Sequence, residues 1–156
     1  YPDVIKKMKS IGCELGNHSY DHADLSKLDP AGIQSQMSRT NDGIRNITGS
    51  GATLMRPPYG AINSTVAANA GLPMILWNID TLDWKTRNAQ STIDAVMNKV
   101  KDGDIILMHD IHTETVDAAL KLIPKLQSEG YQLVTVSELA AAKGKHLLNG
   151  NTYTDF

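Results

Sequence analysis

Short apolar runs alternate with amphipathic segments along the 156-residue chain. Apolar residues recur at three- and four-residue intervals in several segments, and this spacing predicts helices over residues 2–11, 30–48, 63–71, 91–100 and 115–130. Between the helices lie short runs with few charges, which predict strands over residues 14–18, 52–55, 73–79, 104–108 and 131–136. A short helix is expected to follow, through about residue 142. This alternation favours an α/β fold with a parallel sheet and helices outside it.

Local signals refine two of these helices. Asp29 and Pro30 are typical of a helix start, with Asp as the N-cap and Pro at the first helical position, and Ser91 with Asp94 resembles a capping box. The helix over residues 115–130 is expected to bury one face and to kink at Pro124. The expected inner face of that helix consists of Val116, Ala119, Leu120, Ile123 and Leu126.

Composition places the chain among ordinary globular proteins, with 41% hydrophobic and 21% charged residues. We expect one domain over residues 1–142 and a peripheral tail over 143–156. The net charge of −2 gives no reason to expect nucleic acid as a partner, and no stretch approaches the roughly 20 apolar residues of a membrane span.

Candidate chemistry begins at His18 and His22, two imidazoles four residues apart that suit zinc and neighbouring divalent ions. Two surface histidines that happen to lie close together are the plain alternative. Three further clusters follow the predicted strands: Arg56-Pro57-Pro58-Tyr59, Asp80-Thr81-Leu82-Asp83-Trp84 and Leu107-Met108-His109. Active sites of α/β proteins lie at the carboxyl ends of parallel strands, so the four clusters predict one site.

In this order and spacing the clusters resemble the polysaccharide deacetylases of the NodB homology domain, carbohydrate esterase family 4. The family motif H-[ST]-x-x-H is matched by residues 18–22, R-x-P-Y by 56–59, D-x-x-D-W by 80–84 and L-x-H by 107–109. The resemblance covers about residues 1–140. It implies a distorted (β/α) barrel that here lacks its first strand or strands, because a closed barrel needs about eight strands and the sequence predicts five.

The family's first motif, T-F-D-D-G, is absent from this sequence. In the family its first aspartate is the catalytic base and its second is a metal ligand. We therefore expect this chain to be a fragment of the domain, to need the missing N-terminal segment for stability, and to be inactive alone. That segment is a possible partner of the chain.

The resemblance implies removal of an acetyl group with a divalent ion, zinc first and cobalt, nickel or manganese as alternatives. His18 and His22 are the expected metal ligands, and Ser19 between them is expected to hold the loop by hydrogen bonding. His109 is the expected general acid, since an amine leaving group needs a proton. Asp83 would favour the charged form of His109 as a neighbouring carboxylate.

Four further residues receive roles from the resemblance. Arg56 would orient the catalytic aspartate of the complete domain, or pair with Asp83. Tyr59 would offer its backbone N–H to the oxyanion, with Pro58 fixing the turn. Trp84 and Leu107 would wall the pocket for the acetyl methyl group, although ordinary core packing is a serious alternative for Trp84.

The favoured substrate is an N-acetylglucosamine polymer, peptidoglycan or chitin-type, and acetylxylan is the alternative within the family. A carbohydrate-binding relic without catalysis is a second hypothesis, and a structural zinc domain a third, disfavoured because structural sites usually close with four ligands. The expected polysaccharide substrates imply an extracellular or cell-wall location.

Overall fold

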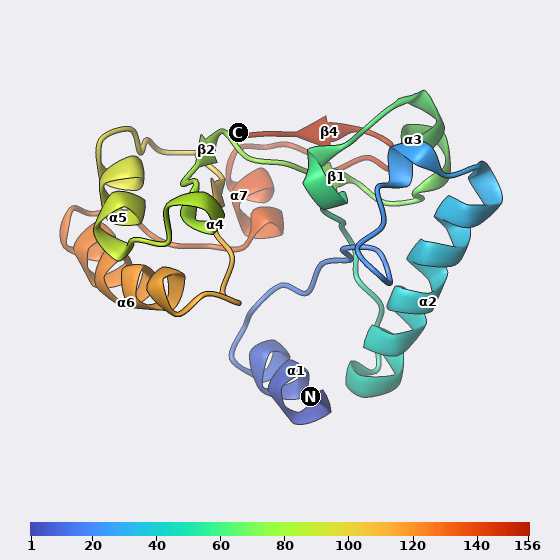
Figure 1. The fold of residues 1–156 in the computed structure, drawn as a ribbon, viewed down its shortest axis with the longest axis horizontal. Helices are drawn as coiled ribbons and strands as arrows, with labels where there is room; N and C mark the ends of the chain where they lie inside the picture. The colour runs from blue at the N-terminus through green and yellow to red at the C-terminus, as the bar shows by residue number, and fades with distance from the viewer. The chain divides into compact units, whose positions relative to one another are not determined.

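The computed structural model describes all residues from 1 to 156. The chain divides into two compact units, Tyr1–Leu76 with Ala140–Tyr153, and Trp77–Leu139 with Thr154–Phe156. The elements are labelled in Figure 1. None of the helices has both the length and the apolar character of a membrane-spanning segment.

The first unit is built around one long helix whose ends the sequence specifies locally. Asp29 accepts a hydrogen bond from the Gly32 N–H as the N-cap, Pro30 is the first helical residue, and Gly49 ends the helix at φ +82°. The elements of this unit are α1 (Pro2–Ser10), η1 (Leu25–Lys27), α2 (Pro30–Thr48), η2 (Pro58–Gly60), α3 (Ser64–Asn69), β1 (Met74–Ile75) and β4 (Thr152–Tyr153).

Strand pairing in the first unit is shorter than predicted. The expected strands over 14–18 and 52–55 are reduced to single parallel bridges, from Asn17 to Met55 and from Met55 to Met74. β1 pairs in parallel with β4. Residues 143–156 were expected to be peripheral, but Thr152 and Tyr153 within them form this strand of the first unit. The bridges at Asn17 and Met55 come directly before His18 and Arg56, which places both motifs at the carboxyl ends of paired segments.

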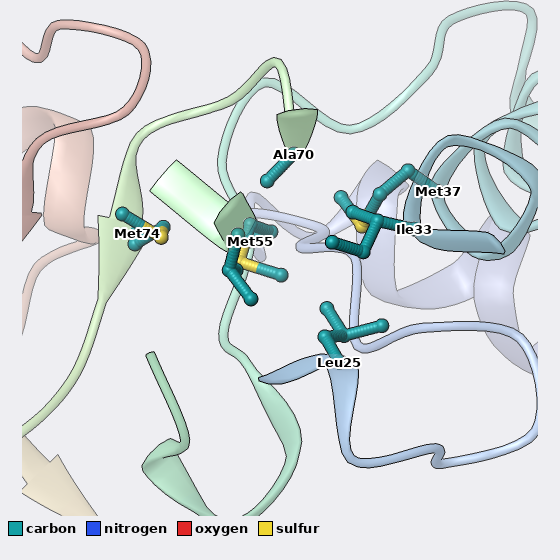
Figure 2. Packing of buried hydrophobic residues seen from close by; sticks show 7 residues of the cluster. Leu25, Ile33, Met37, Met55, Ala70 and Met74 are labelled. Atoms are coloured by element: carbon teal, nitrogen blue, oxygen red, sulfur yellow. The ribbon is translucent and has the colours of Figure 1, made fainter. Parts of the chain in front are cut away.

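The core of the first unit lies between α2 and the paired segments. Ile33 and Met37 of α2 pack with Leu25, Met55, Val66, Ala70 and Met74 in one buried cluster (Figure 2). α1, by contrast, contains no buried residue. The apolar spacing of residues 2–11 therefore predicts the helix correctly but not a buried face, because Val4, Met8 and Ile11 are exposed.

The second unit contains two helices packed side by side. Its elements are β2 (Ile79–Asp80), α4 (Asp83–Thr86), α5 (Ala89–Met97), β3 (Ile106–Leu107), α6 (Thr113–Ser128) and most of α7 (Val136–Ala142). β2 and β3 pair in parallel. The predicted strand over 73–79 is therefore split between β1 and β2, with Trp77 half-buried between them, and residues 131–135 form no strand.

Two side-chain predictions for these helices are wrong. The N-cap of α5 is Asn88, which accepts from the Ser91 N–H, whereas Asp94 accepts from Gln90. The buried face of α6 is Thr115, Ala118, Leu122 and Leu126. Val116, Leu120 and Ile123 are exposed, so the predicted face is rotated by about one residue.

Gly103 supports the carboxyl terminus of the chain. Its φ is +101°, and a Cβ atom added there would lie 2.1 Å from the carbonyl oxygen of Phe156. The Phe156 N–H in turn donates to the Gly103 carbonyl at 3.1 Å. Only a residue without a side chain fits this close approach.

We expect Gly103→Ala to lower the free energy of unfolding by roughly 2–3 kcal/mol, because strain and a backbone clash add. Gly130→Ala is the matched control, since Gly130 has φ +91° and open space around it, and should lose only about 1 kcal/mol from the positive φ. Urea unfolding measures both. Equal losses would show that the contact with Phe156 contributes nothing.

Candidate active site

His18 and His22 lie on the loop that follows the bridge at Asn17. Their ring centroids are 4.9 Å apart at an interplanar angle of 73°, and the His22 ring meets the Tyr59 ring edge-on at 4.8 Å. His18 Nδ1 lies 2.6 Å from the carbonyl oxygen of Arg56. A carbonyl only accepts, so Nδ1 carries the proton and Nε2 the lone pair, which is the tautomer a metal ligand needs.

Helix α2 holds the histidine loop through its polar side chains. Gln36 Oε1 accepts from the Tyr20 N–H at 2.8 Å and from the Asp21 N–H at 3.2 Å. Thr40 Oγ1, one turn further along, donates to the Ser19 carbonyl at 2.7 Å. A rigid helix thus fixes three consecutive residues between the two imidazoles.

Asn17 connects the same helix to the start of the loop. Its buried side chain donates to the Met37 carbonyl at 2.9 Å and to Asn41 at 3.0 Å, and its Oδ1 accepts from the Ser19 N–H at 3.0 Å. Both N–H groups of the amide and its oxygen are thus hydrogen-bonded inside the fold. Sequence reasoning missed Asn17, and its position directly before His18 was the available signal.

The side chain of Ser19 does not hold the loop as predicted. Ser19 is buried and its Oγ has no hydrogen-bond partner. The loop is held instead by the backbone N–H and carbonyl of Ser19. The predicted function of the hydroxyl is therefore corrected.

Arg56 and the turn that follows it complete the candidate site in this unit. The guanidinium donates from Nε to the Ile75 carbonyl and from Nη2 to the Leu76 carbonyl, both at 3.3 Å. Burial lowers the pKa of Arg56, although an arginine remains charged at neutral pH. Pro58 is buried, whereas the Tyr59 side chain is 70% exposed at φ +61°.

The donor set of the first unit fits part of a metal site. Two imidazoles with adjacent rings, one of them held as the Nδ1–H tautomer, are suitable nitrogen ligands for zinc or cobalt. No group of three or more His, Cys, Asp or Glu side chains is arranged to hold an ion.

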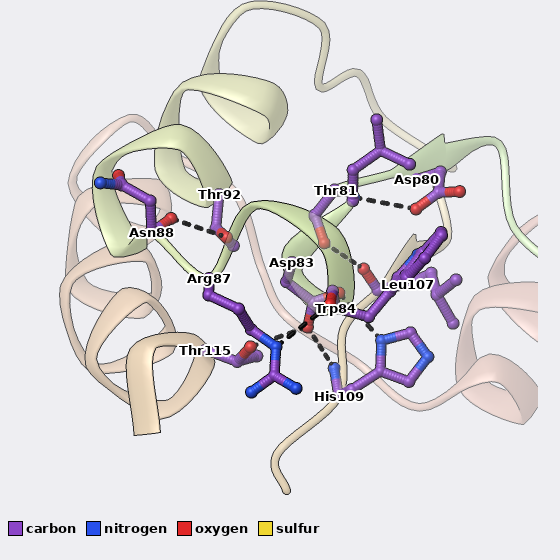
Figure 3. A network of polar contacts seen from close by, with 11 residues as sticks. Asp80, Thr81, Asp83, Trp84, Arg87, Asn88, Thr92, Leu107, His109 and Thr115 are labelled. Carbon is purple, nitrogen blue, oxygen red and sulfur yellow. Dashed lines mark hydrogen bonds and ion pairs between the residues drawn. The ribbon is translucent and has the colours of Figure 1, made fainter. Parts of the chain in front are cut away.

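Asp83 and His109 form a hydrogen-bonded pair in the second unit. Figure 3 shows the carboxylate at the start of α4 facing the imidazole that follows β3. His109 Nδ1 lies 2.9 Å from Asp83 Oδ1, and the His109 N–H donates to Oδ2 at 2.6 Å. Because a carboxylate accepts, Nδ1 donates, and Nε2 is the nitrogen left to exchange a proton with a substrate.

The environment of Asp83 favours its charged form. Burial raises the pKa of Asp83, but hydrogen bonds from His109, Thr115 and the Trp84 N–H outweigh burial, and the pKa lies below its ordinary value. The Thr115 hydroxyl donates to Oδ2 at 2.8 Å. Asp83 is only 1% exposed, so these donors replace water around it.

Stability should therefore depend on pH through Asp83. A lowered pKa contributes stability that is complete above the unfolded value of about 3.9 and is lost as the pH falls through the folded value. We expect the difference in unfolding free energy between the wild type and Asp83→Asn to be largest near neutral pH and to shrink below about pH 4. Urea titrations across this range measure it, with the exposed Asp110→Asn as a control that shows no such trend.

The neighbours of Asp83 are held by a strained turn. Leu82 has φ +52°, and its N–H donates to Asp80 Oδ1 at 2.9 Å. Thr81 Oγ1 donates to the Leu107 carbonyl at 2.8 Å, which joins the turn to β3. Asp80 thus shapes the turn, Leu107 is buried, and Trp84 is 50% exposed, so Trp84 is not a core residue.

Four of the five positive φ angles outside glycine lie within the motifs, and the fifth, Arg87, follows the last motif residue Trp84 by three positions. They occur at Ser19, His22, Tyr59, Leu82 and Arg87. Each such residue costs on the order of 1 kcal/mol or more, and strain of this kind persists where the surrounding structure fixes it, often at functional sites.

The predicted site residues fall into two sets. The first unit brings together His18, His22, Arg56 and Tyr59, with Pro58 in the same turn. The second unit brings together Asp83 and His109, with Trp84 and Leu107 beside them. Each set has its own internal contacts.

Comparison with known proteins supports a single family. A family model described as polysaccharide deacetylase matches residues 1–75. The chain is 43% identical over 143 residues to the peptidoglycan-N-acetylmuramic acid deacetylase PdaC of Bacillus subtilis, covering 92% of this chain and 31% of that protein. It is 41% identical to the peptidoglycan-N-acetylglucosamine deacetylase PgdA of Listeria monocytogenes, covering 99% of this chain and 32% of that protein. The chain thus spans about a third of these relatives.

Solved structures show the same fold. The T48 deacetylase with substrate matches with a TM-score of 0.93 and 38% identity, covering 98% of this chain and 76% of that one. A family 4 acetyl xylan esterase from Clostridium thermocellum, in complex with cobalt, matches with a TM-score of 0.93 and 31% identity, covering 99% and 78%. A family 4 pseudoenzyme from Bacillus anthracis matches with a TM-score of 0.80 and 31% identity, covering 88% and 50%. Such domains are distorted (β/α) barrels, so the expected α/β fold class is confirmed.

Proposed function

Because the chain belongs to the polysaccharide deacetylase family, carbohydrate esterase family 4, we propose that it carries out metal-dependent deacetylation of an N-acetylglucosamine polymer. The reaction adds water across the amide, so the carbon–nitrogen bond breaks and acetate and a free amine form. The observation that carries this proposal is the buried Asp83 carboxylate bonded to His109 Nδ1. That pairing suits an acid which protonates the departing nitrogen.

His18 and His22 are the proposed ligands of the metal ion. When bound, a divalent ion supplies an activated water and polarises the acetyl carbonyl. The Arg56 carbonyl holds His18 in the Nδ1–H tautomer, and α2 keeps the loop between the ligands in place. Zinc is the metal we propose first, and cobalt is the alternative, because the Clostridium thermocellum esterase was solved in complex with cobalt. Two imidazoles require a further ligand, which we propose comes from a segment outside these 156 residues.

His109 would give its Nε2 proton to the leaving nitrogen. The negative charge of the Asp83 carboxylate favours the imidazolium form of His109 before the transfer. The backbone N–H of Tyr59 is the proposed donor to the oxyanion, with buried Pro58 fixing its turn. Arg56 would orient the catalytic base. Trp84 and Leu107 would receive the acetyl methyl group.

Peptidoglycan is the preferred substrate, because PdaC and PgdA, at 43% and 41% identity, are named for it. Acetylxylan is the second candidate, supported by the similarity to an acetyl xylan esterase at 31% identity. Either polymer would place the protein outside the cell or at the cell wall.

The test is acetate release by the complete gene product from peptidoglycan, chitooligosaccharides and acetylxylan, with and without added zinc or cobalt. Metal-dependent release from the first two supports the proposal, and release from acetylxylan alone favours the esterase. No release from any of them, together with retained polysaccharide binding, would favour a non-catalytic role like that of the pseudoenzyme relative. The 156-residue chain assayed alone should bind zinc weakly and release little acetate.

A further inference from the structure

We propose that Thr115 is a positioning residue for the general acid, holding the Asp83 carboxylate in the orientation that pairs with His109. The proposal rests on the function proposed above. Thr115 lies in the first turn of α6, is 2% exposed, and directs its hydroxyl to Asp83 Oδ2 at 2.8 Å. Neither the sequence motifs nor the roles proposed above include this residue.

The two oxygens of Asp83 have different side-chain partners. Oδ2 accepts from the Thr115 hydroxyl and from the His109 backbone N–H, whereas Oδ1 accepts from His109 Nδ1 (Figure 3). The Trp84 N–H is a further, backbone donor to the carboxylate. Two donors on one oxygen fix the rotation of the carboxylate about its Cβ–Cγ bond. Oδ1 is thereby directed at the imidazole, which orients the ring and leaves Nε2 for the substrate.

The hydroxyl of Thr115 is used differently from that of an ordinary buried helical threonine. Such a hydroxyl commonly bonds the carbonyl four residues earlier in its own helix, as Thr92 does in α5, where Oγ1 donates to the Asn88 carbonyl at 3.2 Å. Thr115 instead donates across to α4, a contact that its own helix does not require. The first turn of α6 also presents the positive end of the helix dipole, which favours a nearby carboxylate.

Among titratable side chains, His109 is the partner of Asp83. Arg87, which ends α4, directs its Nε to the Trp84 carbonyl at 3.1 Å. Neutral donors therefore carry much of the stabilisation of this carboxylate, and Thr115 is the one side-chain hydroxyl among them.

The test compares Thr115→Val, which keeps the shape and removes the hydroxyl, with Thr115→Ser, which keeps the hydroxyl. Thr92→Val is the matched control, a buried threonine on the neighbouring helix. Carbon-13 NMR follows the titration of the Asp83 carboxyl, and kinetics with a chitooligosaccharide follow turnover, both in the complete gene product.

We expect Thr115→Val to raise the pKa of Asp83 by about one pH unit and to lower kcat about 10-fold with KM unchanged, because a hydrogen bond to a charged group is lost. Thr115→Ser should retain both wild-type values. The proposal is overturned if Thr115→Val lowers only the melting temperature, as Thr92→Val would, and leaves the Asp83 titration unchanged. If the wild type releases no acetate, the proposed function fails while the titration still decides the role of Thr115.

Discussion

Replacing His22 with alanine is expected to abolish tight zinc binding and to lower deacetylation about 1,000-fold. His22 is one of the two imidazoles on the loop, with its ring 4.9 Å from that of His18. An ion that loses one of few protein ligands is no longer held, and the several kcal/mol by which it stabilises the transition state are lost with it. Isothermal titration with zinc and acetate-release kinetics measure the two effects in the complete gene product.

His146→Ala is the matched control for this substitution. His146 is an exposed histidine with no role in the proposed site, so its loss should change neither zinc affinity nor rate. Unchanged zinc stoichiometry in His22→Ala would contradict the assignment of His22 as a ligand.

The second large effect is expected at His109. Substitution by alanine should lower kcat on an N-acetylated sugar by about 100- to 10,000-fold, the usual range for a general acid. The same variant should hydrolyse p-nitrophenyl acetate with a much smaller loss, since nitrophenolate leaves without a proton whereas an amine does not. Parallel kinetics on the two substrates separate proton donation from a general disturbance of the site.

His112→Ala serves as the control for His109→Ala. His112 lies three residues away at the N-cap of α6 and makes no side-chain capping bond. Its replacement should leave the rates on both substrates unchanged. If His109→Ala lowers the rate equally on the amide and on the aryl ester, His109 supports the structure rather than donating a proton.

Local sequence signals predicted the start of α2 correctly. The N-cap at Asp29 depends on interactions within a few residues, as do the left-handed Gly49 that ends α2 and the N-cap at Asn63 of α3. Such contacts form whatever the rest of the chain does, so they can be read directly. The capping box at Ser91 was wrong because Asn88, three residues earlier, provides the competing cap.

Strands and helix faces were predicted less well, because they depend on distant partners. Residues 131–135 have a strand-like sequence but pair with no segment of the described chain, whereas the polar segment at β4 pairs with β1. The face of α6 was misplaced because hydrophobicity alone favours Val116 over Thr115. Thr115 is buried because Asp83, 32 residues earlier, accepts its hydrogen bond.

The same distinction applies to the site. His18, His22, Asp83 and His109 could be predicted as site residues because the motifs combine particular residue types at fixed spacing. Asn17, Gln36 and Thr40, which hold the histidine loop, could not, because their roles arise only when α2 packs beside it. From the sequence alone, a polar residue on a helix is expected to face solvent, and only the folded structure shows its hydrogen-bond partner.

The left-handed residues of the motifs set a limit on engineering the protein for heat resistance. A glycine at Leu82 would relieve backbone strain of about 1 kcal/mol, yet it would also free the turn that presents Asp83. Screens that select for melting temperature alone should therefore enrich substitutions that weaken turnover. Stabilising changes are better sought in α1, where no side chain is buried and where no motif lies.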